Sequence, residues 1–229
     1  SEVYSQSICD ELKKKHEIVI FTREENPYMP DFSMRKEDGN SLCTYFINMP
    51  RGKDGYRHVE VDLQFRQIIC KERPDIAHIG HLNHLSTGII DELKKQDIPI
   101  VFTLHDFWLM CPRGQFLQRN FDSNRLYELC NNQDDVDCAR NCYNMYFSGK
   151  NDQKDLHIWS GWVMERMAET RQIVDKVDLF IAPSKYLMNR FVRDFNIPQD
   201  KIIYLDYGFP LHYLRPVSKE KKEQPYTFG

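Results

Sequence analysis

The chain has 229 residues, a net charge of -3, 41% apolar residues and 28% charged residues, as in an ordinary soluble globular protein. The negative charge disfavours nucleic acid as a partner, because nucleic-acid binders carry clustered basic charge. No apolar run is long enough to cross a membrane, and the polar N-terminal segment lacks the apolar core of a signal peptide. We therefore expect a cytoplasmic protein without a transmembrane segment.

Helices and strands are predicted to alternate through most of the chain. The predicted helices are residues 2–15, 59–71, 85–96, 155–177 and 185–195, and the predicted strands are 16–22, 41–48, 75–80, 99–104, 178–183 and 202–207. Alternation of this kind is typical of a parallel sheet covered by helices, so we predict an α/β, Rossmann-like, doubly wound fold with helices on both faces. Residues 23–41, broken by proline and glycine, are expected to form a loop.

The domain organisation follows from where this pattern stops. Residues 1–214 are predicted to form one Rossmann-like domain, with residues 107–149 as a long cysteine-bearing insertion loop. Residues 215–229 are charged and lack periodic apolar positions until the last few, so they are predicted to be a linker and the truncated start of another domain. A doubly wound domain normally begins with a strand, whereas this chain begins with a helix. We therefore expect the first strand to lie upstream of residue 1.

Polar side chains follow two predicted strands that a helix connects. These side chains are His81, Asn83, His105, Asp106 and, further on, Arg113. Ligands of open parallel sheets bind at the carboxyl ends of the strands, so both loops are expected at the ligand edge. A histidine there can bind a sugar hydroxyl or a phosphate, or act as acid or base, although it could also only hydrogen-bond its own loop. Arg113 suits bidentate binding of phosphate or carboxylate, or is a surface arginine.

The histidines of the first loop invite a zinc interpretation, because His78, His81 and His84 are spaced three apart. However, His78 lies within the predicted strand, and no carboxylate or cysteine in this loop completes a tetrahedral set. Binding of a polar ligand by His81 or Asn83 is therefore favoured. Asn83 or Ser86 could instead only cap the helix that follows.

Four of the seven cysteines fall within the insertion loop. They are Cys111, Cys130, Cys138 and Cys142. Their spacing does not match the two paired CxxC knuckles of zinc ribbons, yet a loop of this length requires something that orders it. Three interpretations remain open: a structural zinc ion, free thiols lining a small core, or two disulfides. The odd number of cysteines in the whole chain fits reduced thiols better than a secreted disulfide scaffold.

Three stretches, in this order, resemble the N-terminal domain of the family-four (group one) retaining glycosyltransferases. Residues 74–115, PDIAHIGHLNHLSTGIIDELKKQDIPIVFTLHDFWLMCPRGQ, resemble the family's PDxVHxH strand and loop, followed by a helix and a strand that leads into TxHD. Residues 177–191, VDLFIAPSKYLMNRF, resemble its ADxxIAPSxxLRxxF segment. Residues 197–208, IPQDKIIYLDYG, resemble its IPxxKIxVIxYG exit. Together these stretches and the elements between them cover most of the chain.

The resemblance implies a GT-B fold, in which two Rossmann-like halves enclose a catalytic cleft. This chain would be the N-terminal, acceptor-binding half, and the other half would bind most of a nucleotide-sugar donor. His105 matches the family histidine that contacts the donor sugar, and Glu2 matches the end of the GGxE loop. The implied activity is retaining sugar transfer to a glycan or lipid-linked acceptor, without a catalytic metal. A lipid-linked acceptor would place the protein peripherally at the inner membrane face.

Two other functions remain open at this point. A non-catalytic carbohydrate-binding or scaffold domain could keep this fold without its chemistry, since fold alone does not establish activity. A zinc-dependent module built on the four loop cysteines is the weaker alternative. An ExxxxxxxE pair in a downstream half would favour the enzyme, and metal content would identify the zinc module.

Overall fold

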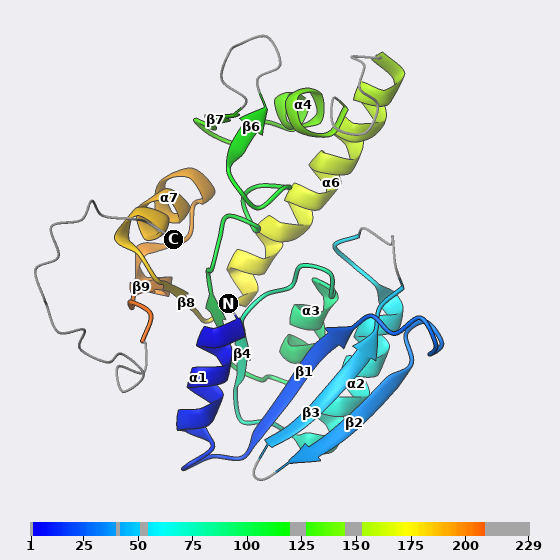
Figure 1. Cartoon of the computed structure of the whole chain (residues 1–229). Helices are drawn as coiled ribbons and strands as arrows, with labels where there is room; N and C mark the ends of the chain where they lie inside the picture. Colours follow the sequence, from blue (N-terminus) through cyan, green and yellow to red (C-terminus); the bar gives the residue numbers. More distant parts are fainter. Residues whose placement is uncertain (1, 40–41, 51–54, 120–126, 145–152, 209–229) are drawn as a thin grey trace, which may run out of the picture.

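The computed structural model describes residues 2–39, 42–50, 55–119, 127–144 and 153–208 (Figure 1). Its strands form two main sheets, which we call sheet A and sheet B, and one small hairpin. The predicted linker, residues 215–229, lies outside the described residues, so the predicted domain boundary stays a prediction. No helix in the described ranges is long and apolar enough to span a bilayer.

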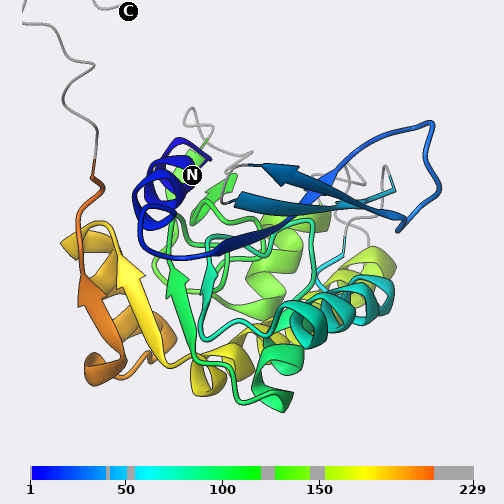
Figure 2. The same ribbon diagram turned by 90° about the horizontal axis from the view of Figure 1, so that it is seen from below.

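Sheet B is entirely parallel and contains the ligand edge. Its strands, in spatial order, are β4 (Ala77–Ile79), β5 (Ile100–Thr103), β8 (Leu179–Ala182) and β9 (Ile202–Tyr204). The helices that connect them are α3 (Gly88–Lys95), α6 (Gln153–Lys176) and α7 (Lys185–Phe195). Seen from below, the four strands run side by side with β9, in orange, at the outer edge (Figure 2). A parallel sheet flanked by helices confirms the predicted Rossmann-like α/β fold.

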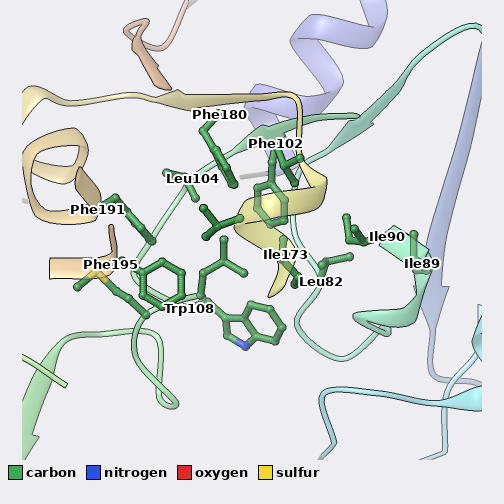
Figure 3. Close-up of a cluster of buried hydrophobic side chains, with 14 of the residues drawn as sticks. Leu82, Ile89, Ile90, Phe102, Leu104, Trp108, Ile173, Phe180, Phe191 and Phe195 are labelled. Atoms are coloured by element: carbon green, nitrogen blue, oxygen red, sulfur yellow. The ribbon is translucent and has the colours of Figure 1, made fainter. Parts of the chain in front are cut away.

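The main core lies between sheet B and its helices. Phe102 of β5 and Phe180 of β8 are register partners, and their ring centroids lie 5.9 Å apart. Ile173 of α6 and Phe191 and Phe195 of α7 pack into the same cluster (Figure 3). Full burial of such side chains contributes roughly 1.5–3 kcal/mol each, so this cluster fixes the strands whose ends form the site.

Two helix boundaries follow from local signals. Ser184 is the N-cap of α7, where its Oγ accepts a hydrogen bond from the Leu187 N–H at 3.2 Å, as predicted. The helix predicted from residue 85 begins only at Gly88, because residues 82–87 form a turn in which His84 has a φ of 60°. Ser86 Oγ accepts the N–H of Gly88 at 3.2 Å, so it satisfies one of the free donors at the start of α3.

Sheet A corrects the prediction that residues 23–41 form a loop. Strand β1 (Ile18–Glu24) pairs in parallel with β3 (Leu42–Asn48), and β2 (Met34–Gly39) pairs with β3 in the antiparallel direction. The charged sequence of β2, MRKEDG, has no apolar alternation, which is why hydropathy did not indicate a strand. It is an edge strand, and charged side chains are common there because they oppose aggregation. One face of sheet A is covered by α2 (Val59–Glu72), whose Phe65 ring lies 5.1 Å from Phe21.

The described part of the insertion, residues 107–119 and 127–144, is more ordered than predicted. It contains the hairpin β6 (Leu117–Arg119) and β7 (Tyr127–Leu129), helix α4 (Asp135–Cys138) and the π-helix η1 (Ala139–Asn144). Each element is three to six residues long. Such elements are too short for a periodic apolar pattern, so the sequence did not reveal them.

The first helix, α1 (Glu2–Leu12), buries none of its residues completely. Its N-terminal part lies beside β4 (Figure 1), and a Cβ at Gly80, just after β4, would be 3.5 Å from Ser5 Oγ. Among the described residues, β1 and β4 each have one edge without a strand partner. A strand upstream of residue 1 stays a prediction.

Candidate active site

The two predicted polar loops do meet, at the carboxyl ends of β4 and β5. His81 follows β4, and its Nε2 lies 3.2 Å from Oδ2 of Asp106, which follows β5. The backbone N–H of Asn83 donates to Nδ1 of His81 at 2.8 Å. Because Nδ1 accepts that bond, the proton of the neutral ring is on Nε2 and is donated to Asp106. The loop backbone therefore sets the tautomer that joins the two loops.

Asp106 is held from a second side by its own loop. Its Oδ1 accepts the backbone N–H of Trp108 at 2.8 Å. Partial burial opposes ionisation, but the hydrogen bond from His81 and the N–H of Trp108 lower the pKa of Asp106 below its usual value. The loop closes at Gly114, which has a φ of +77° and accepts the N–H of Phe107 at 3.0 Å. Glycine adopts this conformation without steric cost, so the loop returns close to Asp106.

His105 lies at the centre of an aromatic cluster. Its Nδ1 is 2.6 Å from the hydroxyl of Tyr207, and the two rings are stacked at 5.5 Å. The ring of Tyr4, from α1, meets His105 edge-on at 5.3 Å. Burial is the main cause that lowers the pKa of His105 to about 4. His105 is therefore neutral at physiological pH, and its Nε2 is buried without a hydrogen-bond partner.

A small pocket joins these groups. It is lined by Gly80, His81, Phe102, Thr103, Leu104, His105, Asp106, Trp108 and Leu109. Its polar lining comes mainly from residues at the ends of β4 and β5, and its apolar lining includes the core residues Phe102, Leu104 and Leu109. The arrangement offers a carboxylate that accepts hydrogen bonds and a neutral imidazole with an unused nitrogen, which suits a ligand rich in hydroxyl or phosphate oxygens.

A buried arginine supports the pocket from behind. Arg166 of α6 is only 2% exposed, and its Nη2 donates to the carbonyl oxygen of Trp108 at 2.6 Å. Its guanidinium also lies 4.6 Å from the Trp108 ring centre, in a cation–π contact. Trp108 in turn meets His81 edge-on at 5.6 Å. Helix α6 thus holds the loop that carries Asp106 in place.

The other predicted binding residues are not all in this pocket. Glu2 begins α1, the helix that brings Tyr4 to His105. Asn83 is exposed, and its backbone N–H donates to Nδ1 of His81. Arg113 is not among the residues that line the pocket. Its positive charge favours the ionised form of the Tyr143 phenol, and that phenol donates to the carbonyl oxygen of Pro112 at 2.9 Å. Its predicted role in binding phosphate or carboxylate stays a prediction.

Two of the three histidines, His78 and His81, have separate partners. His78, in β4, is 2.7 Å from Thr103 Oγ1 across the strand pair β4–β5, whereas His81 binds Asp106. No group of three histidine, cysteine or acidic side chains in the described ranges is arranged to hold a metal ion. The preference for a polar ligand at His81 stays a prediction.

The four insertion-loop cysteines lie close together, and the structure joins none of them by a disulfide. Cys111 and Cys142 are buried in the core cluster, and Cys130 and Cys138 pack against it. Burial, together with the proximity of the other thiols, raises the pKa of Cys130 to about 11 and that of Cys138 to about 12. Zinc requires thiolates, and no metal-holding arrangement occurs among the described residues, so the zinc interpretation stays a prediction.

Sequence reasoning missed three residues of the site, namely Tyr4, Trp108 and Tyr207. Trp108 lies two residues after Asp106 and was a detectable candidate, because an aromatic ring beside a polar loop is typical of a binding surface. Tyr207 was visible only as part of the YG exit after the last strand. Tyr4 carried no signal, because its proximity to His105 depends on where α1 packs.

The comparison with protein families agrees with this geometry. The model of Glycosyltransferase Family 4 matches residues 1–211, which is nearly the whole chain and includes β4, β5, β8, β9 and both polar loops. No curated protein matches the chain. The match covers far more than half of the sequence, and the parallel sheet with its polar ligand edge is the fold expected from the motifs. The chain therefore belongs to glycosyltransferase family 4.

Proposed function

We propose that this chain is the acceptor-side half of a retaining glycosyltransferase, which transfers a sugar from a nucleotide-sugar donor to a glycan or lipid-linked acceptor. Membership in the family supports sugar transfer in general. The observation that carries the proposal is His105, a neutral imidazole with a buried, unpartnered Nε2 in a pocket at the ligand edge.

The chemistry of the pocket suits this reaction. Sugar transfer from a nucleotide donor develops negative charge on the leaving phosphate, and fixed hydrogen-bond donors in a site without bulk water stabilise such charge strongly. His105 supplies one donor. Asp106, which is ionised and oriented by His81, can accept a hydrogen bond from an acceptor or donor hydroxyl. Most of the rate enhancement would come from positioning and charge stabilisation, without a catalytic metal.

The test is sugar transfer by a chain that contains both halves, compared with residues 1–229 alone. We expect no transfer by residues 1–229, because they would lack most of the donor site. In the two-half enzyme, His105→Ala should lower turnover roughly 100-fold or more, the scale of a lost charge-stabilising or acid–base group. His157→Ala, an exposed histidine on α6, is the matched control and should keep full turnover.

Three outcomes would contradict the proposal. Rapid transfer by residues 1–229 alone would refute the two-half mechanism. A loss below about threefold in His105→Ala, far below the range for such groups, would remove His105 from the site. Saturable binding of sugars without transfer by the two-half protein would favour the carbohydrate-binding alternative. If the acceptor is lipid-linked, we further propose a peripheral location at the inner membrane face, which cell fractionation would test.

A further inference from the structure

His105 is held from two elements that are far apart in sequence. Tyr207 follows β9, and its hydroxyl lies 2.6 Å from Nδ1 with the rings nearly parallel, at 20°. Tyr4 of α1 contacts both rings, at 5.3 Å from His105 and 4.8 Å from Tyr207. Two aromatic rings and one hydrogen bond therefore restrict rotation of the imidazole about its side-chain bonds.

The direction of the hydrogen bond follows from elementary acid–base chemistry. Burial, together with the negative charge of Asp106 and the proximity of Tyr4, raises the pKa of Tyr207, so its phenol is protonated at neutral pH. A phenol O–H is a far stronger acid than the N–H of a neutral imidazole, and an imidazole nitrogen is a far better acceptor than a phenol oxygen. Tyr207 therefore donates, and Nδ1 of His105 accepts.

We propose that Tyr207 is a positioning residue for His105: by donating to Nδ1, it places the single proton of the ring on Nε2 and keeps that N–H available to an oxygen of the bound sugar donor. This inference rests on the proposed function for the identity of the ligand. The hydrogen bond and the tautomer themselves do not depend on it.

The proposal explains two observations together. Nε2 is the one polar atom of His105 that is buried without a partner, and it belongs to a residue that lines the pocket. If Nδ1 were the protonated atom, Nε2 would present a lone pair, which repels the oxygens of an ionised phosphate. With Tyr207 as donor, the same atom presents a hydrogen-bond donor instead.

The first test is ¹⁵N–¹H correlation NMR of the histidine side chains of the purified chain, with His105 assigned by comparison with His105→Gln. We expect the Nε2–H tautomer in the unsubstituted protein. Tyr207→Phe removes the donor to Nδ1, so part of the His105 population should change to the Nδ1–H tautomer.

The tautomer of the neutral ring decides the direction of the bond, because the Tyr207 hydroxyl could accept from Nδ1 only if Nδ1 carried the proton. An Nδ1–H tautomer in the unsubstituted protein, or the same tautomer in Tyr207→Phe as in the unsubstituted protein, would each overturn the proposal. Tyr4→Phe is the matched control: it removes a hydroxyl from the same aromatic cluster and should leave the tautomer unchanged, because Tyr4 contacts His105 through its ring.

Other ionisable groups around the ring must keep their charge across these variants. They are Asp106, His81 and His78, which act on the pKa of His105, and Tyr4, whose ring contacts it. Neither tyrosine substitution changes the charge of Asp106, His81 or His78. A change of the His105 tautomer in Tyr207→Phe but not in Tyr4→Phe therefore reports the lost hydrogen bond.

A second test uses the two-half enzyme. Tyr207→Phe should lower kcat with little change in KM, because the donor N–H acts mainly on the charge of the transition state. A normal kcat in Tyr207→Phe, together with a large loss in His105→Ala, would overturn the positioning role while leaving the proposed function intact. The NMR result requires no substrate, so it judges the positioning role even if transfer is never observed.

Discussion

Replacement of His105 should change how the stability of the protein depends on pH. The environment of His105 lowers its pKa from 6.5 to about 4, mainly through burial. Between these values the unfolded chain binds a proton that the folded chain does not bind. Stability therefore falls as the pH falls below about 6.5, and this contribution levels off near pH 4. The full difference corresponds to about 3 kcal/mol, which we reduce to about 1–2 kcal/mol because the ring is only partly buried.

The measurement is urea unfolding at pH steps from 7.5 to 4.5, followed by tryptophan fluorescence, for the unsubstituted chain and for His105→Gln. We expect the free energy of unfolding of the variant to decline less with acid, by about 1–2 kcal/mol at pH 4.5. A smaller slope should remain in both proteins, because burial also lowers the pKa of His78. His157→Gln, at an exposed position on α6, should follow the unsubstituted protein. Parallel curves for His105→Gln and the unsubstituted chain would refute the reasoning.

Two further predictions concern the neighbouring loop and the cysteines. Asp106→Asn should lower the free energy of unfolding, measured with urea, by about 1 kcal/mol at neutral pH, because the NH2 of the amide would face one of the two N–H donors from which Asp106 now accepts. Since the pKa of Asp106 is lowered in the folded protein, the difference between variant and unsubstituted chain should vanish well below pH 4. An equal loss at pH 7 and pH 3 would contradict this prediction. Because the pKa values of Cys130 and Cys138 are raised, we expect far less than one zinc ion per chain in protein purified without chelator, and stoichiometric zinc would show instead that the thiols form a coordination shell. The buried Cys111 and Cys142 should react with a thiol reagent only after unfolding.

The elements that have a clear local pattern in the sequence were predicted, and those without such a pattern were missed. The segments of β5, β8 and α7 were predicted nearly to the residue, because each has a clear apolar pattern and a local stop or cap such as Ser184. The edge strand β2 was missed, because its charged side chains pair with β3 and with one another rather than with the core. Arg35, for example, binds Glu24 and lies over the Phe46 ring at 3.9 Å.

Some positions of the candidate site could also be predicted from the sequence, and others could not. His81 and Asp106 could be placed together from sequence, because parallel strands bring their carboxyl ends to one edge of the sheet. Arg113 belongs to the same loop but is not among the residues that line the pocket, because the path of this loop depends on contacts with other elements, such as the hydrogen bond from Arg166 of α6 to Trp108.

The sequence by itself determined the family and the alternating strands and helices of sheet B, and it predicted the edge of that sheet at which ligands should bind, because these depend on local periodicity and on short motifs. Only the tertiary structure decided the burial, the tautomer and the pKa of His105. Its partner Tyr207 is 102 residues away, and Tyr4 reaches it from the opposite end of the chain. Burial, the choice of tautomer and a lowered pKa are properties of the packed environment, which no stretch of sequence contains.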